Sequence, residues 1–217
     1  MTARVASVNV GRPRPVDTGR RVVGTAIWKR PVAGRVAVRG VNVDGDDQAD
    51  RTVHGGPDKA VYAYALEEIR QWEDELGRPL GAAAFGENLT TEGIDVSGAL
   101  VGERWRIGTT LLEVTAWRTP CANFARYWDV PDLVKRFAAH GATGAYLRVL
   151  ETGELGAGDA IEVVSRPDHG LTVETAFRIA TFEKSRLPEL LPALQHLPIK
   201  DQAKVAAKIE KRLAVHA

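Results

Sequence analysis

The chain has 217 residues, of which 44% are hydrophobic and 26% charged, and its formal net charge is +1. This length and composition predict one large domain, or a domain with an appendage, built around an ordinary hydrophobic core. The near-neutral charge argues against a protein that binds duplex nucleic acid, and the single cysteine excludes an internal disulfide framework. No apolar stretch has the length of a membrane span and no signal peptide is visible, so we expect a cytoplasmic protein.

Short strands separated by turn residues are predicted over the first 165 residues, because β-branched and apolar residues dominate or alternate there. The expected strands are 4–10, 21–28, 35–43, 61–65, 100–107, 110–117, 146–150 and 160–164. Four of these strands are expected to form two hairpins. Strand 100–107 pairs with 110–117 around Gly108, and strand 146–150 pairs with 160–164 at the end of the fold. Two helices, 66–76 and 130–140, are inserted among the strands and end at Gly77 and Gly141. This order predicts a mainly β fold, an antiparallel β-barrel with inserted helices.

The character of the chain changes near residue 167. Glycine becomes rare, and helices are predicted at 172–182, 187–194 and 199–215. We therefore divide the chain into a β-barrel domain, 1–167, and a C-terminal three-helix domain, 168–217. The last helix is basic, and we interpret its lysines as a solvated face rather than a nucleic-acid surface.

The cysteine follows the strand 110–117 in the segment Arg118-Thr119-Pro120-Cys121. Pro120 cannot donate a ladder hydrogen bond, so the strand should end before Cys121. A thiol held beside a cation such as Arg118 can become a thiolate, the form that binds metals and attacks electrophiles. From this segment alone, a small buried hydrophobic cysteine is the commoner outcome.

A glycine segment, Arg51-Thr52-Val53-His54-Gly55-Gly56-Pro57-Asp58-Lys59, is the second unusual feature. Gly55 and Gly56 let the backbone approach a ligand closely and offer N–H groups, while Arg51, His54 and Lys59 add donors and positive charge. A plain turn is the alternative. The acidic residues just before it, 44–50, lack the glycine and glutamate of an EF-hand and are predicted to form a solvated loop.

The third feature is Phe85-Gly86-Glu87-Asn88-Leu89. Asn88 carries donors and an acceptor, so it can hydrogen-bond a polar ligand. The alternative, equally open at this point, is that Glu87 and Asn88 tie down the local backbone.

These three segments, in this order and followed by a helical tail, resemble the MOSC-domain family, which is related to the C-terminal domain of molybdenum cofactor sulfurase. The resemblance is closest to the bacterial YiiM-like branch, which also carries a C-terminal three-helix domain. It implies a MOSC-type β-barrel whose cleft is lined by the three segments and binds molybdenum cofactor (molybdopterin). At the level of the family it also implies pyridoxal phosphate binding. The implied activity is reduction of N-hydroxylated compounds, such as 6-hydroxylaminopurine, with electrons from a separate redox protein.

The resemblance also implies roles for individual residues. Cys121 would be catalytic and would be the molybdenum ligand, since a soft thiolate suits such a centre. The cofactor would be bound by Arg51, His54, Gly55, Gly56, Lys59, Asn88 and Arg118. His54 or Asp58 would deliver protons, although His54 could instead bond a loop carbonyl and Asp58 could cap a turn.

Two other functions stay open at this point. Cys121 could carry a persulfide in sulfur transfer, or the domain could bind the cofactor without catalysis. The sequence has neither a GxGxxG fingerprint nor the cysteines of an iron–sulfur cluster, so a redox reaction would need an external electron donor.

Overall fold

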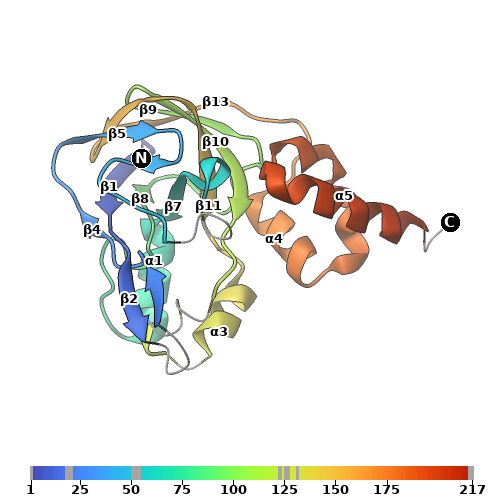
Figure 1. Cartoon of the computed structure of the whole chain (residues 1–217), viewed down its shortest axis with the longest axis horizontal. Helices are drawn as coiled ribbons and strands as arrows, with labels where there is room; N and C mark the ends of the chain where they lie inside the picture. Colours follow the sequence, from blue (N-terminus) through green and yellow to red (C-terminus); the bar gives the residue numbers. More distant parts are fainter. Residues whose placement is uncertain are drawn as a thin grey trace.

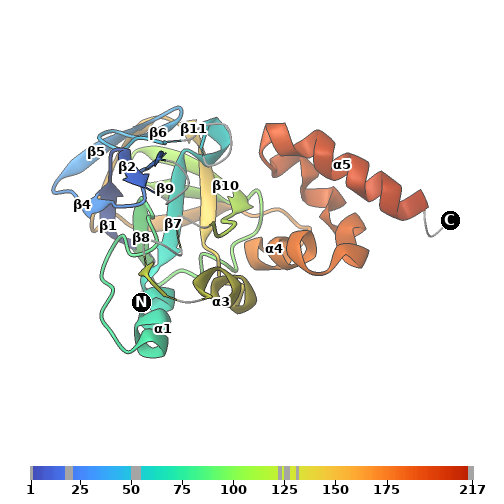
Figure 2. The ribbon, with the colours of Figure 1, turned by 60° about the horizontal axis from the view of Figure 1, so that its bottom comes forward.

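The computed structural model describes residues 2–17, 22–49, 55–121, 124, 128–130 and 132–214. Figure 1 shows a strand-rich body that carries a group of helices, including α4 and α5, on one side. In the turned view of Figure 2, the last helix, α5, extends away from the body. Within the described part of the chain, no helix has the length and apolar character needed to span a membrane.

The body is built from short strands, as the alternating pattern predicts. They are β1 (Arg4–Val10), β2 (Arg14–Asp17), β3 (Val22–Thr25), β4 (Arg30–Pro31), β5 (Arg35–Arg39), β6 (Asn42–Val43), β7 (Val61–Ala65), β8 (Leu89–Glu92), β9 (Arg104–Ile107), β10 (Thr110–Trp117), β11 (Ala145–Glu151), β12 (Gly153–Gly156) and β13 (Ile161–Ser165). The helices are η1 (Pro57–Lys59), α1 (Leu66–Leu76), α3 (Leu133–His140), α4 (Val173–Thr181), η2 (Lys184–His196) and α5 (Ile199–Ala214).

An eight-stranded sheet with the order β13-β9-β10-β11-β7-β8-β1-β4 forms the centre of the body. Its pairs are antiparallel except for β7 and β8, which run parallel. The prediction of a mainly β fold is confirmed, but the sheet is not closed into a barrel by a full ladder. Instead, the start of β1 meets β13 at one bridge, Arg4 to Ala160, beside a hydrogen bond of 2.9 Å from the Ile161 N–H to the Ala3 carbonyl.

The predicted hairpin around Gly108 is confirmed, since β9 and β10 pair with Thr110 opposite Ile107 and Gly108 has a φ of +56°. The predicted closing hairpin is wrong. β11 pairs with β10 and β7, whereas β13 pairs with β9. The segment between them, expected to be a turn, is itself a strand, β12, which pairs with β5 and buries Leu155 completely. Burial of that leucine holds the connection against the body. The chain then continues into β13, an edge strand of the sheet.

The helices follow the predicted order. α1 ends at Gly77, whose φ of +63° and N–H bond to the Glu73 carbonyl make the left-handed cap that glycine favours. The middle helix of the C-terminal group, η2, is a 3-10 helix rather than an α-helix, and it contains Pro188 and Pro192. Each proline removes the N–H that an α-helical hydrogen bond would need.

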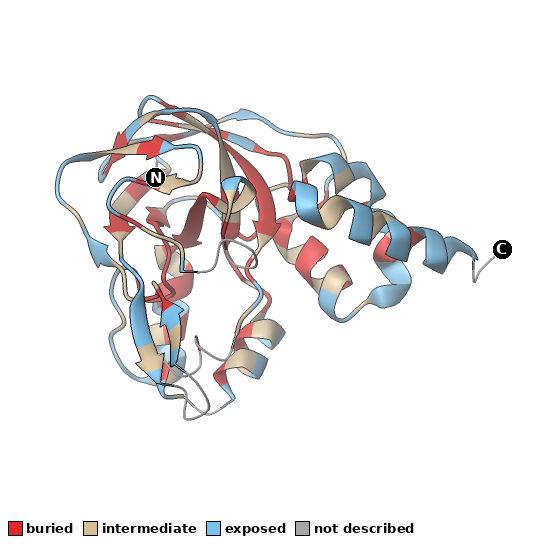
Figure 3. Ribbon diagram, viewed as in Figure 1, coloured by how far each residue is buried: buried red, intermediate tan, exposed pale blue. Residues whose placement is uncertain are grey.

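The C-terminal helices share the core of the sheet. One cluster of buried side chains joins Leu112 and Val114 of β10 to Val173 and Ile179 of α4. Figure 3 shows this buried side of α4 facing the sheet. The division of the chain at residue 167 stays a prediction, because the hydrophobic core is continuous across it.

A second, aromatic cluster lies between the sheet and the inserted helices. It contains Tyr62 and Tyr64 of β7, Trp72 of α1, Phe85, and Phe137 of α3. Tyr64 and Phe85 have ring centroids 4.6 Å apart, and Trp72 stacks on Phe137 at 6.0 Å. Tyr62 of this cluster also lines the pocket described below.

Candidate functional site

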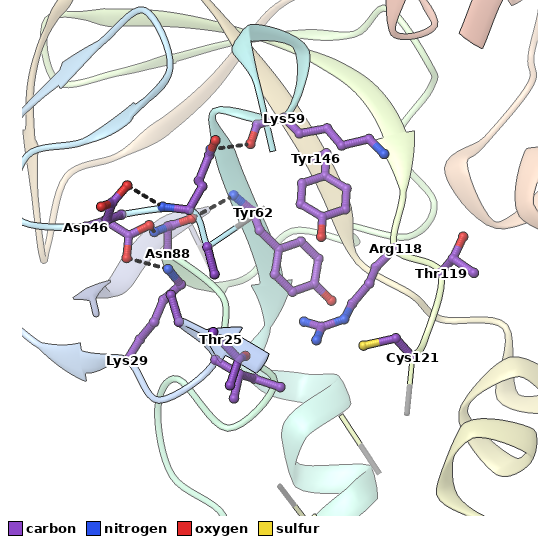
Figure 4. Close-up of a pocket in the computed structure, with 17 residues that line it drawn as sticks. Thr25, Lys29, Asp46, Lys59, Tyr62, Asn88, Arg118, Thr119, Cys121 and Tyr146 are labelled. Atoms are coloured by element: carbon purple, nitrogen blue, oxygen red, sulfur yellow. Dashed lines mark hydrogen bonds and ion pairs between the residues drawn. The ribbon is translucent and has the colours of Figure 1, made fainter. Parts of the chain in front are cut away.

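A pocket of about 130 Å³ lies where the loops before β4 and η1 meet the ends of β7 and β10. Figure 4 shows the side chains on its wall. The labelled residues that line it are Thr25, Lys29, Asp46, Lys59, Tyr62, Asn88, Arg118, Thr119, Cys121 and Tyr146. Residues from all three unusual segments, Lys59, Asn88 and Cys121, therefore share one pocket.

Cys121 is a free, half-buried thiol on the pocket wall. β10 ends at Trp117, before Pro120, as the sequence predicts. In Figure 4 the sulfur points toward the guanidinium of Arg118. Cys121 is therefore not the fully buried hydrophobic residue of the alternative, although it packs against the aromatic cluster.

Arg118 is a fixed positive charge on the thiol side of the pocket. Its side chain is almost fully buried and donates a hydrogen bond from Nη1 to the Phe85 carbonyl. The guanidinium carbon lies 5.0 Å from the ring centroid of Tyr62 and 4.9 Å from that of Phe124. Burial raises the pKa of Tyr62 well above its ordinary value, although Arg118 opposes this shift, so the Tyr62 hydroxyl stays protonated.

Lys59 supplies a second cation. Its Nζ lies 5.5 Å from the centroid of the Tyr146 ring, which also lines the pocket. Burial lowers the pKa of Lys59, and Lys200 at the start of α5 adds to this effect.

Gly55 and Gly56 both lie against the side chain of Gln48. The Gly56 N–H donates to Gln48 Oε1 at 2.8 Å, and a Cβ on Gly55 would lie 2.2 Å from the same oxygen. Gln48 Nε2 in turn donates to the Lys59 carbonyl at 3.1 Å. The prediction that the Gly56 N–H is offered to a ligand is therefore wrong, and neither Gly55 nor Gly56 lines the pocket.

The Phe85–Leu89 segment is tied down by its own side chains. The buried Glu87 carboxylate accepts hydrogen bonds from the N–H groups of Ala83 (2.8 Å) and Phe85 (2.9 Å) and from the Thr90 hydroxyl (2.7 Å). Gly86 has a φ of +73°, a conformation that glycine adopts without strain.

Asn88 lines the pocket, but its amide is engaged in the protein. Its Oδ1 accepts from the Tyr62 N–H at 3.1 Å, and its Nδ2 donates to the Asn9 carbonyl (3.2 Å) and to Asp46 Oδ2 (2.9 Å). Both donors are thus used, so Asn88 fits the backbone-fixing alternative better than direct contact with a cofactor.

A buried ion pair between Lys29 and Asp46 forms the other end of the pocket, and the sequence analysis missed it. Their side chains are 8% and 2% exposed. Asp46 Oδ1 also accepts from the Gly11 N–H at 2.8 Å. The expected solvated acidic loop is therefore wrong for Asp46. Burial lowers the pKa of Lys29, and the Asp46 carboxylate opposes this effect.

Asp58 lies outside the pocket, and its carboxylate faces the C-terminal helices. Oδ2 accepts from the Ile199 N–H at 2.8 Å, and Oδ1 lies 3.3 Å from Arg148 Nε. The predicted proton delivery by Asp58 does not fit this position. Arg51 and His54 lie outside the described residues, so their roles stay predictions.

Within the described ranges, no group of three or more His, Cys, Asp or Glu side chains is placed to hold a metal ion. A metal bound by Cys121 would therefore need further ligands that these side chains do not supply.

A model of the MOSC domain matches residues 50–162, slightly more than half of the chain. The chain belongs to the MOSC domain family. The uncharacterized protein YflK of Bacillus subtilis is 39% identical over 81% of this chain and 79% of its own length. The crystal structure of YiiM from Geobacillus stearothermophilus superimposes with a TM-score of 0.79 at 31% identity, covering 95% of this chain and 99% of that one.

A third relative is a longer protein. The reductase of Gibberella moniliformis is 30% identical over 89% of this chain, which spans only 35% of the length of that protein. Together with the family match, these relatives support a function associated with molybdenum cofactor, and confirm the YiiM-like resemblance.

Proposed function

We propose that this MOSC domain binds molybdenum cofactor in the pocket and reduces N-hydroxylated compounds there, with Cys121 as the molybdenum ligand. The observation that carries the proposal is the presence of the chain's only thiol in one pocket with three cationic side chains, Lys29, Lys59 and Arg118.

The donor set of the pocket fits this group. A thiolate is the soft ligand that a sulfur-rich molybdenum centre favours. The cofactor carries an anionic phosphate, and Arg118 and Lys59 would supply charge-assisted hydrogen bonds to it. Arg51 and His54 would add to this set from the neighbouring segment.

The residues of the pocket would bind and orient the substrate. When bound, the cofactor supplies the two electrons that break the N–O bond. The overall reaction consumes two protons and two electrons, and converts R–NHOH into R–NH₂ and water. Tyr62 and Tyr146, whose ring centroids are 5.0 Å apart, offer aromatic surface to a planar base analogue. Burial raises the pKa of Tyr146, so it keeps its O–H on the pocket wall.

The electrons would come from a separate redox protein. The chain has one cysteine and no dinucleotide fingerprint, so it has no evident carrier of its own. The extra length of the reductase relative is compatible with this arrangement.

The test is turnover of 6-hydroxylaminopurine by cofactor-loaded protein, with a reduced viologen dye as electron source. We expect Cys121→Ser to lose at least about 100-fold in turnover, more than the loss of an outer-shell partner of a metal costs. Unchanged turnover in Cys121→Ser would contradict the proposal. Bound cofactor without any turnover would favour the binding-module alternative, and a reducible extra sulfur on Cys121 in intact-mass spectra would favour sulfur transfer.

A further inference from the structure

The C-terminal helices contact the turn that carries a pocket residue. Asp58, in the middle of η1, accepts the N–H of Ile199, the first residue of α5, at 2.8 Å. That N–H is one of the donors a helix leaves without an internal partner at its N-terminus. A carboxylate in this position also interacts favourably with the positive end of the helix dipole. The partner of the α5 N-terminus thus lies 141 residues earlier in the chain.

Arg148 of β11 joins the same contact. Its Nε lies 3.3 Å from Asp58 Oδ1, and its Nη2 donates to the carbonyls of His196 (2.8 Å) and Leu197 (3.0 Å), just before α5. The Asp58 and Arg148 side chains are 13% and 18% exposed, so water screens their interaction only partly. One arginine therefore bridges the turn, the sheet and the start of the last helix.

The η1 turn is held from two other sides. The Thr115 hydroxyl of β10 donates to the Asp58 carbonyl at 2.6 Å, and Gln48 donates to the Lys59 carbonyl at 3.1 Å. The sheet and the acidic loop thus each hold η1 by one hydrogen bond to its backbone, and the C-terminal helices hold it through the Asp58 side chain. Lys59, the next residue, lies on the pocket wall.

We propose that Asp58 is a positioning residue that couples the C-terminal helices to the pocket by fixing the η1 turn and, through it, Lys59. The ligand that Lys59 would bind rests on the proposed function, but the coupling itself does not. The C-terminal helices then support the wall of the pocket that contains Lys59. The same geometry explains why an aspartate between Pro57 and Lys59 points away from the pocket.

The first test measures amide hydrogen exchange in the cofactor-free protein. In Asp58→Ala we expect exchange to speed up by at least about fivefold both at the start of α5 and at Lys59, whose N–H bonds to the Gly56 carbonyl at 3.0 Å. Asp58→Asn keeps an oxygen that can accept from Ile199 and should show a smaller increase at both places. Asp168→Ala, which removes an exposed aspartate outside this contact, is the matched control and should show neither.

Faster exchange at the start of α5 alone would overturn the proposal, because Asp58 would then be only a helix cap. Unchanged exchange at both places would overturn it as well. This readout needs neither cofactor nor turnover, so it stands even if the proposed function fails.

The second test uses the loaded protein. We expect Asp58→Ala to release bound cofactor about fivefold faster, since Lys59 contributes to binding the cofactor phosphate, and to change kcat per bound cofactor less than twofold. Asp58→Asn should lie between the wild type and Asp58→Ala. A loss in kcat per bound cofactor, with cofactor release unchanged, would assign Asp58 to the chemical step and contradict a positioning role. Absence of turnover in the wild type would instead count against the proposed function.

Discussion

At the scale of single residues, this protein buries several ionisable side chains and stabilises each by a different kind of contact. Asp46 pairs with Lys29, Glu87 accepts hydrogen bonds from two backbone N–H groups and a hydroxyl, and Arg118 stacks on aromatic rings. Glu68 of α1 differs from these. It is 8% exposed, and its Oε2 lacks a hydrogen-bond partner. Burial, with the nearby Asp95 carboxylate adding to the effect, raises the pKa of Glu68 to about 7.

This pKa predicts a pH-dependent stability. The folded protein keeps the Glu68 proton up to about pH 7, whereas the unfolded chain loses it near the ordinary value of 4.5. Below pH 4.5 Glu68 is protonated in both states and its burial does not lower the unfolding free energy. As the pH rises from 4.5 to 7 the unfolding free energy falls, because the unfolded chain releases this proton more readily than the folded protein. Relative to Glu68→Gln, the wild type should lose about 3 kcal/mol of unfolding free energy over this range. Urea unfolding at several pH values measures it.

Asp74→Asn, an exposed change on the same helix, is the control and should follow the wild type at every pH. Parallel profiles for the wild type and Glu68→Gln would show that Glu68 is ionised in the folded protein.

At the scale of elements, α4 is the part of the C-terminal group that packs on the sheet. Thr172 caps its N-terminus, since its hydroxyl oxygen accepts a hydrogen bond from the Thr175 N–H at 3.0 Å. The helix buries Val173, Ala176 and Ile179 against β10 and its neighbours. Because this surface belongs to the main core cluster, we expect the sheet and the C-terminal helices to unfold together.

Ile179→Ala tests this cooperativity. Removing the fully buried side chain should cost about 2–5 kcal/mol of unfolding free energy. All five tryptophans lie between residues 28 and 128, so their fluorescence reports on the body, while circular dichroism also reports on the tail helices. Both signals should shift together to lower urea, and Leu213→Ala, at an exposed position of α5, should shift neither. A shift confined to the helical signal would instead support two independent domains, divided near residue 167.

At the scale of the whole molecule, local sequence features predicted the helices and most of the strands, but not β2, β4, β8 or β12, and not the long-range partners. Arg118 and Cys121 could be placed together because only Pro120 and one more residue separate them at a strand end. The pairs Lys29–Asp46 and Asp58–Ile199 could not be predicted, since each joins distant segments that only the sheet topology brings together. The closing hairpin failed for a related reason. Leu155 lies in a segment rich in glycine that looked like a turn, yet its burial makes that segment a strand.

In the proposed function, Cys121 holds molybdenum in this pocket. The most direct test is metal and pterin analysis of the wild type beside Cys121→Ser, both made in a host that synthesises the cofactor. The chain has no second cysteine that could replace the ligand. We predict near-stoichiometric molybdenum in the wild type and its loss in Cys121→Ser, with the melting temperature of the two proteins compared as a control for folding. Equal molybdenum in the two proteins would contradict the account.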